Sequence, residues 1–488
     1  MELNGSRLII AALRGGSGKT VVSLGLAAAW RRYLGLRIIP FKKGPDYIDA
    51  GWLSVAAGHS CYNLDPFLMK PEDIVSSFVR HSGKGDGSLI EGNRGLYDGV
   101  DANGSYSTAE LAKLLRCPVV LVLDATKVTR TAAAMVLGCR HLDPEVNIAG
   151  VILNQVAGKR HEKVLRESIE QLCQVPVLGV VPKADRNFFP ERHLGLVPPQ
   201  EAEDISEAVS YAASKMREYL DLEALWKTAG TAGPLGWPLL VPGIGKSADG
   251  PVKIGIIRDS AFQFYYPENF EALEDRGAEL VEISSLESSS LPHVDALYIG
   301  GGFPETHLER LSANDKFRES VRKAIDAGLP VYAECGGLMF LCRTIEHQGR
   351  TFPMVGVFPF DIVLGPKPQG HGYTIMESIN PNPFFQKGTV IRGHEFHYSR
   401  IADSLDPDSF PFIFKLRKGH GIVAGWDGIC YKNVLAAYSH IHAVGNENWA
   451  DAVMAAARSH QRNKSGMSAD SGYCSERSVP GSHGYLSV

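Results

Sequence analysis

The sequence lacks the features expected of a secreted, membrane-spanning or polynucleotide-binding protein. It contains no uninterrupted run of about 18 apolar residues, the length needed for a membrane span. The opening stretch, MELNGSRLIIAALRGG, has neither the cationic nor the apolar region of a secretory signal. Positive charge is not in excess, because 50 Lys and Arg residues face 54 Asp and Glu, for a net charge of −4. We therefore expect a cytoplasmic protein with no membrane and no nucleic acid as partner.

Cysteine spacing typical of structural metal sites is also absent. The eight cysteines form no CxxC pair, and they stand at positions 61, 117, 139, 173, 335, 342, 430 and 474. In a reducing compartment such residues do not cross-link, so a cysteine in a special local setting becomes a candidate for reactivity.

Two α/β domains are predicted from the alternation of apolar strands with amphipathic helices. In residues 1–227, near-continuous apolar strands such as 8–13 alternate with helical stretches, which is typical of a parallel sheet covered by helices on both faces. The Gly- and Pro-rich stretch 228–250 predicts a linker. The alternation restarts over residues 251–458, and the Ser- and Gly-rich residues 459–488 predict a disordered tail.

A phosphate-binding loop follows the first strand. Its residues are Gly15, Gly16, Ser17, Gly18, Lys19 and Thr20. Such a loop presents backbone N–H groups and a helix N-terminus to a polyphosphate, which predicts an ATP site. We expect Lys19 to reach the outer phosphates and the Thr20 hydroxyl to bind Mg²⁺. Leu13 stands where the usual pattern has its first glycine. The alternative, a glycine-rich turn that binds nothing, is disfavoured by the GKT ending.

Two polar loops follow the second and third strands, at the edge of a parallel sheet where ligands bind. Asp46 and Glu91 are predicted ligands of Mg²⁺ or of its water molecules. The basic residues of these loops, candidates to neutralise substrate carboxylates or the transferring phosphate, are Lys42, Lys43 and Arg94. Solvated loop charge is the alternative reading, and for Asp49 and Asp98 the sequence favours neither.

Cys335 is the predicted nucleophile of the second domain. It follows the predicted strand 330–334 and precedes Gly336 and Gly337, which open a helix, as in a nucleophile elbow. We expect the helix N-terminus to lower the pKa of the thiol. The N–H group of Gly336 and the glycine loop ending at Gly302 are expected to hold an oxyanion. A buried structural cysteine is the alternative, which the flanking glycines disfavour.

The cysteine needs a general base, and five histidines are candidates: His371, His394, His397, His440 and His442. His440 stands in the last strand of the domain, where a partner returning late in the chain can face the elbow. We expect His440 and His442 to point to opposite sides of that strand, so that only one of them can serve, and we prefer His440. The third residue of the site stays unassigned, because His442 occupies the place of an orienting acid.

The motifs as a set resemble the cobyrinate a,c-diamide synthase family, glutamine amidotransferases whose N-terminal half is similar to dethiobiotin synthetase. The matching stretches are GGSGKT, FKKGPDYID, EGNRGLYDG, STAELAKLL, GVILNQVAG, PERHLGLVP, YIGGGFPE, ECGGLMFL, GHEFHYS and AYSHIH. The resemblance implies a P-loop amide synthase domain followed by a class I glutamine amidotransferase-like α/β domain.

The resemblance also implies roles for individual residues. Cys335 matches the family's nucleophile, and His440 matches the histidine that activates it. Lys19 and Thr20 match the nucleotide loop. The residues expected near metal or tetrapyrrole are Asp46, Glu91, Lys42, Tyr47, Ile48, Arg94 and Asp98. By resemblance the substrate is cobyrinic acid, amidated at its a and c acetate side chains with ATP, Mg²⁺ and glutamine, and a homodimer is one option for the assembly.

Three alternatives stay open. A close branch amidates nickel-sirohydrochlorin, and EGNRGLYDG is similar to that branch as well. The stretch beginning at Arg14 also resembles deviant P-loop ATPases that dimerise and act as switches or partitioning modules, which need no elbow cysteine. A tetrapyrrole carrier without enzymatic activity is the third.

Overall fold

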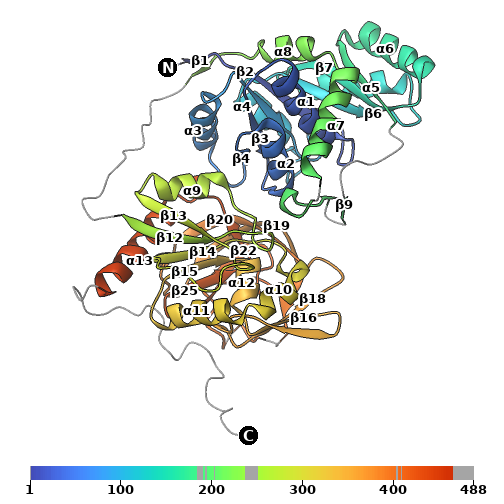
Figure 1. The fold of residues 1–488 in the computed structure, drawn as a ribbon. Coiled ribbons are helices and arrows are strands. Elements are labelled where there is room, and N and C mark those ends of the chain that lie inside the picture. Colours follow the sequence, from blue (N-terminus) through green and yellow to red (C-terminus); the bar gives the residue numbers. More distant parts are fainter. Residues whose placement is uncertain are drawn as a thin grey trace. The chain divides into compact units, whose positions relative to one another are not determined.

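A computed structural model describes most of the chain, which divides into two compact units, Met1–Val241 and Pro242–Val488 (Figure 1). The described residues are 2–183, 191–192, 195–202, 204–236, 251–402, 405–407 and 409–464. The division lies inside the stretch that the sequence predicts as a linker. Each unit contains its own central sheet and hydrophobic core.

The first unit is built on a seven-stranded sheet of order β4-β3-β5-β2-β6-β7-β8, in which every pairing is parallel. Its strands are β2 (Ser6–Ala12), β3 (Ile38–Lys43), β4 (Tyr62–Leu64), β5 (Gly87–Glu91), β6 (Val119–Asp124), β7 (Ile148–Val156) and β8 (Val177–Pro182). Its helices are α1 (Lys19–Tyr33), α2 (Ile48–Ala57), α3 (Pro71–Ser82), α4 (Thr108–Leu114), α5 (Thr131–Leu142), α6 (Lys159–Cys173), α7 (Ile205–Tyr219) and α8 (Leu222–Ala229), with the 3-10 turn η1 (Pro199–Glu201). The predicted parallel α/β sheet is confirmed.

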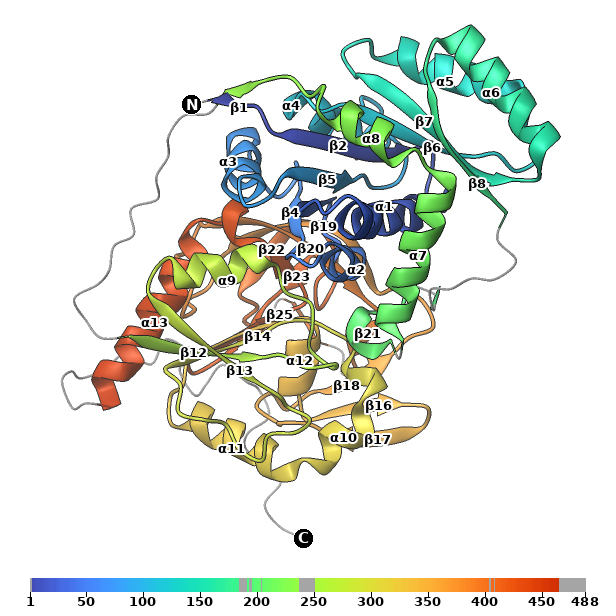
Figure 2. The same ribbon diagram turned by 45° about the horizontal axis from the view of Figure 1, so that its top comes forward.

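The helix that follows the phosphate loop is held in the core by close packing. Figure 2 shows α1 beside strands β2 and β5. Alternate residues of β2 pack into one cluster with Trp30 of α1, which is fully buried. Gly25 lets α1 approach α7, because a Cβ atom there would lie 2.4 Å from Met216 Cγ. The strand–loop–helix unit is therefore fixed at both of its ends.

The beginning of the predicted linker belongs to the first unit. Short strands β1 (Glu2–Leu3) and β11 (Leu235–Gly236) pair antiparallel. The guanidinium of Arg7, which is buried, donates to the carbonyl groups of Leu115 and Gly233. A second small pair joins β9 (Glu191–Arg192) to β10 (Gly195–Leu196). Residues 237–250 of the predicted linker lie outside the described residues.

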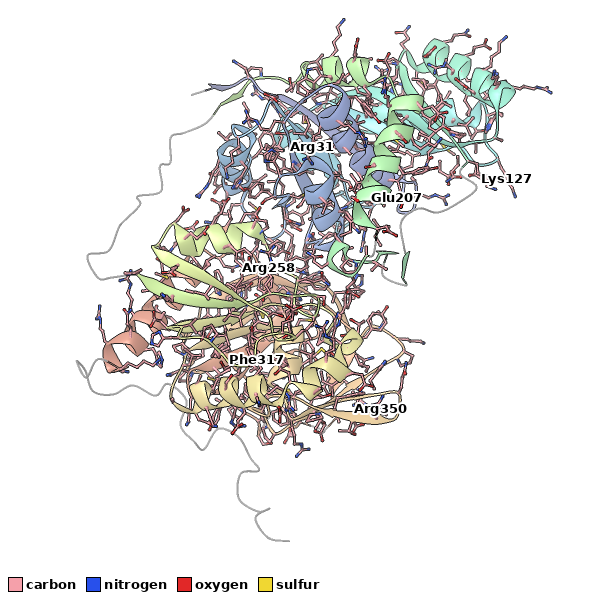
Figure 3. All side chains as sticks on the ribbon, viewed as in Figure 1. Arg31, Lys127, Glu207, Arg258, Phe317 and Arg350 are labelled. Carbon is pink, nitrogen blue, oxygen red and sulfur yellow. The ribbon has the colours of Figure 1, made fainter. Side chains whose placement is uncertain are left out.

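The second unit contains a six-stranded sheet of order β13-β12-β14-β15-β25-β24, parallel except for its last pairing. The strands are β12 (Val252–Ile257), β13 (Ala278–Ile283), β14 (Ala296–Ile299), β15 (Val331–Glu334), β24 (Ile429–Tyr431) and β25 (Val434–Ala437). The helices are α9 (Pro267–Glu274), α10 (Leu308–Ala313), α11 (Asp315–Asp326), α12 (Gly336–Leu341) and α13 (Asn448–Lys464), with 3-10 turns η2 (Pro304–Thr306) and η3 (Ala443–Gly445). Phe317 of α11 is fully buried against this sheet, whereas Arg350 projects from the surface (Figure 3).

Two further sheets of the second unit are not expected from the sequence. A five-stranded antiparallel sheet has the order β23-β22-β19-β20-β26 and carries four of the five candidate histidines, all but His442. Its strands are β19 (Gly370–Ser378), β20 (Val390–His397), β22 (Phe414–Lys418), β23 (Trp426–Asp427) and β26 (His440–Ile441). A four-stranded sheet is formed by β17 (Arg350–Pro353), β16 (Thr344–His347), β18 (Asp361–Leu364) and β21 (Ser399–Ile401).

The C-terminal end of the described chain is helical for longer than the sequence predicts. Helix α13 continues to Lys464, so the disordered tail predicted from residue 459 is wrong for residues 459–464. The amphipathic helix keeps Ala457 and His460 buried against the unit. Residues 465–488, Cys474 among them, lie outside the described residues. Within the described ranges, none of the helices has the length and apolar character of a membrane span.

Candidate active sites

The phosphate loop of the first unit adopts a conformation that depends on its glycines. Gly16 and Gly18 have φ angles of 74° and 89°, in the left-handed region that residues with a Cβ atom rarely adopt. Gly18 also lies against Asn154 at the end of β7, because a Cβ atom there would come within 2.2 Å of Asn154 Nδ2. The same amide group donates to the Ser17 carbonyl oxygen at 3.0 Å. The loop is therefore braced from a neighbouring strand, with its backbone N–H groups ahead of α1.

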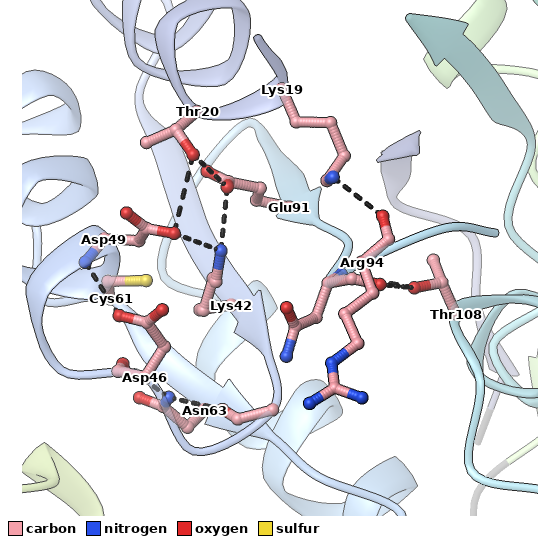
Figure 4. Close-up of polar contacts among 12 residues, drawn as sticks. Lys19, Thr20, Lys42, Asp46, Asp49, Cys61, Asn63, Glu91, Arg94 and Thr108 are labelled. Carbon is pink, nitrogen blue, oxygen red and sulfur yellow. Dashed lines mark hydrogen bonds and ion pairs between the residues drawn. The ribbon is translucent and has the colours of Figure 1, made fainter. Parts of the chain in front are cut away.

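Lys19 ties the phosphate loop to the loop after β5 (Figure 4). Its Nζ donates to the carbonyl oxygen of Arg94 at 2.7 Å and to that of Arg14 at 3.3 Å. Burial lowers the pKa of Lys19 from its ordinary value. Two carbonyl oxygens are weak partners for an ammonium group, so a phosphate oxygen would replace them favourably.

Beside this lysine, four polar side chains meet, two from the ends of strands β3 and β5 and two from the first turns of helices α1 and α2. Lys42 Nζ lies 2.6 Å from Asp49 Oδ2 and 2.7 Å from Glu91 Oε1. The Thr20 hydroxyl donates to the same Glu91 oxygen at 2.8 Å (Figure 4). Burial alone would lower the pKa of Lys42, but Asp49 and Glu91 outweigh it and raise that pKa well above its usual range. Burial raises the pKa of Glu91 despite its lysine partner. The cluster is thus a buried charge network and not a solvated loop.

The residues of this cluster fit a divalent cation bound together with a nucleotide. Glu91 Oε2 is buried without a hydrogen-bond partner among the described residues, and it belongs to the carboxylate that Thr20 contacts. No three His, Cys, Asp or Glu side chains are grouped as metal ligands in the part of the chain that the structure describes. A cation here would therefore need phosphate oxygens or water to complete its shell, as Mg²⁺ does with nucleotides.

The structure brings Asp49 closer to this position than Asp46. Asp49 Oδ2 lies 3.5 Å from Thr20 Oγ1, whereas Asp46 Oδ1 accepts a hydrogen bond from the Asp49 backbone N–H at 2.9 Å. Burial, followed by the charge of Asp49, raises the pKa of Asp46 to about 7. Asp46 thus orders the first turn of α2, and Asp49 is the carboxylate beside the threonine. From the sequence we preferred Asp46 and left Asp49 undecided, whereas in the structure Asp49 is the one near Thr20.

The remaining residues predicted to contact a substrate have different surroundings. Lys42 is buried and paired, so its ammonium group is not directed at solvent. Tyr47 and Ile48 are half-buried at the start of α2. Arg94 is exposed and has a φ angle of 52°, while Asp98 Oδ2 accepts from the Gly95 N–H at 2.8 Å and closes that turn. Arg94 is therefore the residue of this set most available to an anionic ligand.

In the second unit, Cys335 occupies a strained turn between β15 and α12. Its φ and ψ angles are 47° and −101°, and its N–H donates to the Ala437 carbonyl at 2.7 Å. The thiol-bearing residue is buried, with 5% of its surface exposed. A residue with a Cβ atom is held at such a φ angle only by its surroundings, which is typical of functional turns.

The prediction that a helix N-terminus lowers the thiol pKa is wrong. Burial, followed by the charge of Glu305, raises the pKa of Cys335 well above its usual range. The N–H of Gly336 acts in the opposite direction, but burial outweighs it. The resting cysteine is therefore a neutral thiol that requires a base.

The glycine loop after β14 packs directly on this turn. A Cβ atom on Gly336 would lie 3.1 Å from the Gly302 backbone nitrogen. One on Gly301 would lie 2.4 Å from His440 Cε1 and 3.2 Å from its Nε2. The three features that the sequence places far apart, namely the elbow, the glycine loop and His440, are thus in contact. The backbone N–H groups of Gly336 and Gly302 lie in the same small region.

Of the five candidate histidines, His440 is the one that borders the glycine loop. It pairs with His394 across β26 and β20, and the two rings stack at 4.9 Å. His442 is fully buried elsewhere, with its Nε2 3.6 Å from Glu268 Oε1. The expectation of opposite faces rests on a wrong reason, since residues two apart in a strand share a face. The two rings differ because β26 ends at Ile441, before His442.

The other two histidines have local partners in the antiparallel sheet. His397 Nδ1 lies 2.8 Å from the Ser399 carbonyl oxygen, and its ring stacks on Tyr438 at 3.7 Å. His371 is exposed and packs edge-on to Phe396.

Comparison with known proteins gives a family match for each of the two units. Residues 8–197 match the CobQ/CobB/MinD/ParA nucleotide binding domain, and residues 253–448 match the CobB/CobQ-like glutamine amidotransferase domain. The cobyrinate a,c-diamide synthase of Magnetococcus marinus is 44% identical over 448 residues, which cover 91% of this chain and 95% of that protein. Those of Methanothermobacter thermautotrophicus and Archaeoglobus fulgidus are 41% and 40% identical, over 90% and 91% of this chain and 96% and 95% of their own. The chain belongs to the cobyrinate a,c-diamide synthase family.

Membership of the cobyrinate a,c-diamide synthase family confirms the resemblance drawn from the motifs. It also accounts for the likeness to switch and partitioning ATPases, because the nucleotide-binding match includes MinD and ParA in its description. The second match covers the unit that holds Cys335 and His440, which a switch ATPase would not need.

Sequence reasoning missed one charged residue of the second site. Glu334 Oε2 lies 3.5 Å from His440 Nδ1, and the carboxylate is buried. The residue stands directly before Cys335 in the sequence. Its position next to the predicted nucleophile was a signal in the sequence that this carboxylate belongs to the site. Its contact with His440, however, depends on strand pairing, which the sequence does not show.

Proposed function

We propose that this chain uses ATP and glutamine to amidate the a and c acetate carboxylates of cobyrinic acid. The observation that carries the proposal is the presence of two chemically different sites in one chain. One is a phosphate loop with a carboxylate–threonine cluster, and the other is a cysteine elbow packed on a glycine loop that a histidine borders. The names of its relatives supply the substrate and the positions of the two amides.

In the first unit, the task is to convert a carboxylate into an acylating agent. Hydroxide is a poor leaving group, so transfer of the γ-phosphoryl group of ATP to the carboxylate makes attack by ammonia feasible. Lys19 would hold the outer phosphates, in place of the carbonyl groups that it contacts now. Mg²⁺, when bound by Thr20, Glu91 and the phosphates, would neutralise charge that develops on the transferred group. Arg94 would neutralise a second carboxylate of the ring.

In the second unit, glutamine would be hydrolysed through a thioester. Cys335 Sγ attacks the side-chain amide carbon, and His440 Nε2 takes the thiol proton. The N–H groups of Gly336 and Gly302 would hold the oxyanion. His440 then gives the proton to the departing nitrogen as the C–N bond breaks, and water hydrolyses the thioester to glutamate. The raised pKa of Cys335 fits this order, because the thiol stays neutral until the base removes its proton.

Mass spectrometry of the product tests the proposal. Purified chain is incubated with ATP, Mg²⁺ and amide-¹⁵N glutamine, and with cobyrinic acid or nickel-sirohydrochlorin in parallel. Two ¹⁵N atoms incorporated into cobyrinic acid are expected. Labelling of nickel-sirohydrochlorin alone would overturn the assignment of cobyrinic acid as substrate, but it would leave the assignment as a glutamine-dependent amide synthase intact. ATP hydrolysis that is indifferent to both rings and to glutamine would overturn the class and favour a switch ATPase.

A further inference from the structure

A buried carboxylate that the mechanism above does not use lies beside the nucleophile. Glu334 is the last residue of β15, directly before Cys335, and 1% of its surface is exposed. Its Oε2 accepts a hydrogen bond from the Tyr298 hydroxyl at 3.1 Å and lies 3.5 Å from His440 Nδ1. Its Oε1 accepts from the backbone N–H of Ile441 at 3.0 Å. The carboxylate therefore contacts both the ring of the histidine and the backbone of the next residue.

No strong cation compensates for this charge within the described ranges of the chain. The ion pair recorded for Glu334 there is with His440, and it becomes a full ion pair only when the imidazole is protonated. Burying a carboxylate without a permanent cation costs free energy. The charge also contributes to raising the pKa of Cys335, after burial and Glu305. Toward the thiol alone, the carboxylate is unfavourable, so its benefit must lie with the histidine.

The position of His440 shows what that benefit is. With Nδ1 directed at Glu334, the opposite edge of the ring faces the glycine loop, where a Cβ atom on Gly301 would lie 3.2 Å from Nε2. A second titratable group packed on the ring is His394, stacked from β20. Glu334 thus supplies a carboxylate oxygen on the Nδ1 side of the ring, while the Nε2 side faces the glycine loop.

We propose that Glu334 is the positioning residue of the glutamine-hydrolysing site, holding His440 as the tautomer with hydrogen on Nδ1. This inference rests on the proposed roles of Cys335 and His440. In that tautomer Nε2 carries no hydrogen, and it takes the proton as the cysteine S–H bond breaks and the S–C bond forms, which leaves an imidazolium ion. The carboxylate stabilises that ion until Nε2 gives its proton to the nitrogen of the breaking C–N bond and ammonia departs. Glu334 exchanges no proton and forms no covalent bond.

Substitution of the carboxylate by an amide separates this role from packing. In Glu334→Gln the amide oxygen can still accept from Ile441, but the NH₂ group would face Nδ1 and favour the wrong tautomer. We expect kcat for glutamine hydrolysis to fall on the order of 10²-fold or more, in line with carboxylate-to-amide changes in hydrolase triads. The KM for glutamine should change less than about threefold, because glutamine binds before the imidazolium forms. Synthesis from ammonium salts should be unaffected, because it does not involve the cysteine–histidine site.

Glu334→Asp and a second buried glutamate serve as controls. The shorter aspartate keeps the charge but loses packing, so a positioning role ranks Asp above Gln in kcat, whereas a structural role ranks Gln above Asp. Glu268→Gln removes the charge of an equally buried glutamate whose partner is His442, and its glutamine hydrolysis should stay within about threefold of the unsubstituted enzyme. Thermal unfolding of all variants shows whether a loss of kcat reflects a loss of folded protein. Among the folded variants, the order of kcat between Glu334→Asp and Glu334→Gln then decides between a positioning and a structural role.

Two results would overturn the inference. One is a Glu334→Gln enzyme with unchanged kcat, and the other is an equal loss in Glu334→Gln and Glu268→Gln. Retention of glutamine hydrolysis by Cys335→Ser and His440→Ala in the same series would instead refute the proposed function. The two failures are therefore distinguishable.

Discussion

The site of the first unit buries a lysine between two carboxylates. That of the second unit buries a thiol and, directly before it in the chain, a carboxylate that faces an imidazole. In the first, Lys42, Asp49 and Glu91 already neutralise much of one another's charge. In the second, the charge of Glu334 is compensated only when His440 is protonated. The first site is thus arranged to accept charge brought by a ligand, and the second to compensate for charge created by a proton transfer.

The largest expected effect separates the two sites completely. Cys335→Ser should reduce glutamine-dependent synthesis on the order of 10³-fold, because a buried hydroxyl is a much poorer nucleophile than a thiol. Synthesis from ammonium chloride should stay within twofold of the unsubstituted enzyme, at about the precision of such assays. Product formation from each nitrogen source is measured by mass spectrometry. Loss of both activities would show that the sites do not divide the work as proposed.

A change in the first site should affect both nitrogen sources. Lys19→Ala removes the ammonium group expected to bind the outer phosphates, and should lower synthesis on the order of 10²- to 10³-fold with glutamine or with ammonium. Glutamine hydrolysis assayed alone should persist. Lys163→Ala, at an exposed position of α6, is the matched control and should leave synthesis unchanged. Normal synthesis by Lys19→Ala would remove the phosphate loop from the mechanism.

The buried charge of the first site predicts a pH-dependent stability. The pKa of Asp46 rises from 3.8 to about 7 in the folded chain, so over that range the folded state binds more protons than the unfolded state. The free energy of unfolding therefore falls as pH increases through this window. Asp46→Asn keeps an acceptor for the Asp49 N–H but removes the titration. The stabilisation it gives should be about 2–3 kcal/mol larger at pH 8 than at pH 5.

Urea unfolding in the presence of a chelator measures this difference. A variant whose stability relative to the unsubstituted chain does not change with pH would show that the Asp46 carboxyl is ionised throughout.

The smallest expected effect concerns the basic residue at the start of the phosphate loop. Arg14 pairs with Asp124 at 2.9 Å, but its side chain is 72% exposed. Exposed ion pairs contribute little, so Arg14→Ala should change the free energy of unfolding by less than about 1 kcal/mol and synthesis by less than about threefold. Steady-state assays and urea titration check both values. A loss comparable to that of Lys19→Ala would revive the comparison with dimerising switch ATPases.

Short stretches of sequence were sufficient to predict those parts of the two sites whose residues are neighbours in the chain. The phosphate loop and the cysteine turn each consist of a strand, glycines and a helix in succession, and both are found at the predicted residues. The parallel sheets follow from apolar strands alternating with helices.

What the sequence could not provide depends on long-range pairing and burial. Glu334 meets the His440 segment because β15 pairs with β25, where Glu334 lies opposite Ala437. Asp49, rather than Asp46, lies near Thr20 because of the direction in which α2 begins. The raised pKa of Cys335 reflects enclosure by surrounding elements, which a helix-terminus argument from local sequence does not include.

The backbone at Cys335 also has a consequence for how the protein can change. A φ angle of 47° suits glycine, and a side chain there carries about 1–3 kcal/mol of conformational strain. In a chain selected for stability alone, a residue with less backbone strain would be expected at this position. Retaining a cysteine there instead means that part of the folding free energy is given up to keep sulfur in the turn. A substitution of Cys335 that raises thermal stability, such as one to glycine, would therefore also remove the nucleophile.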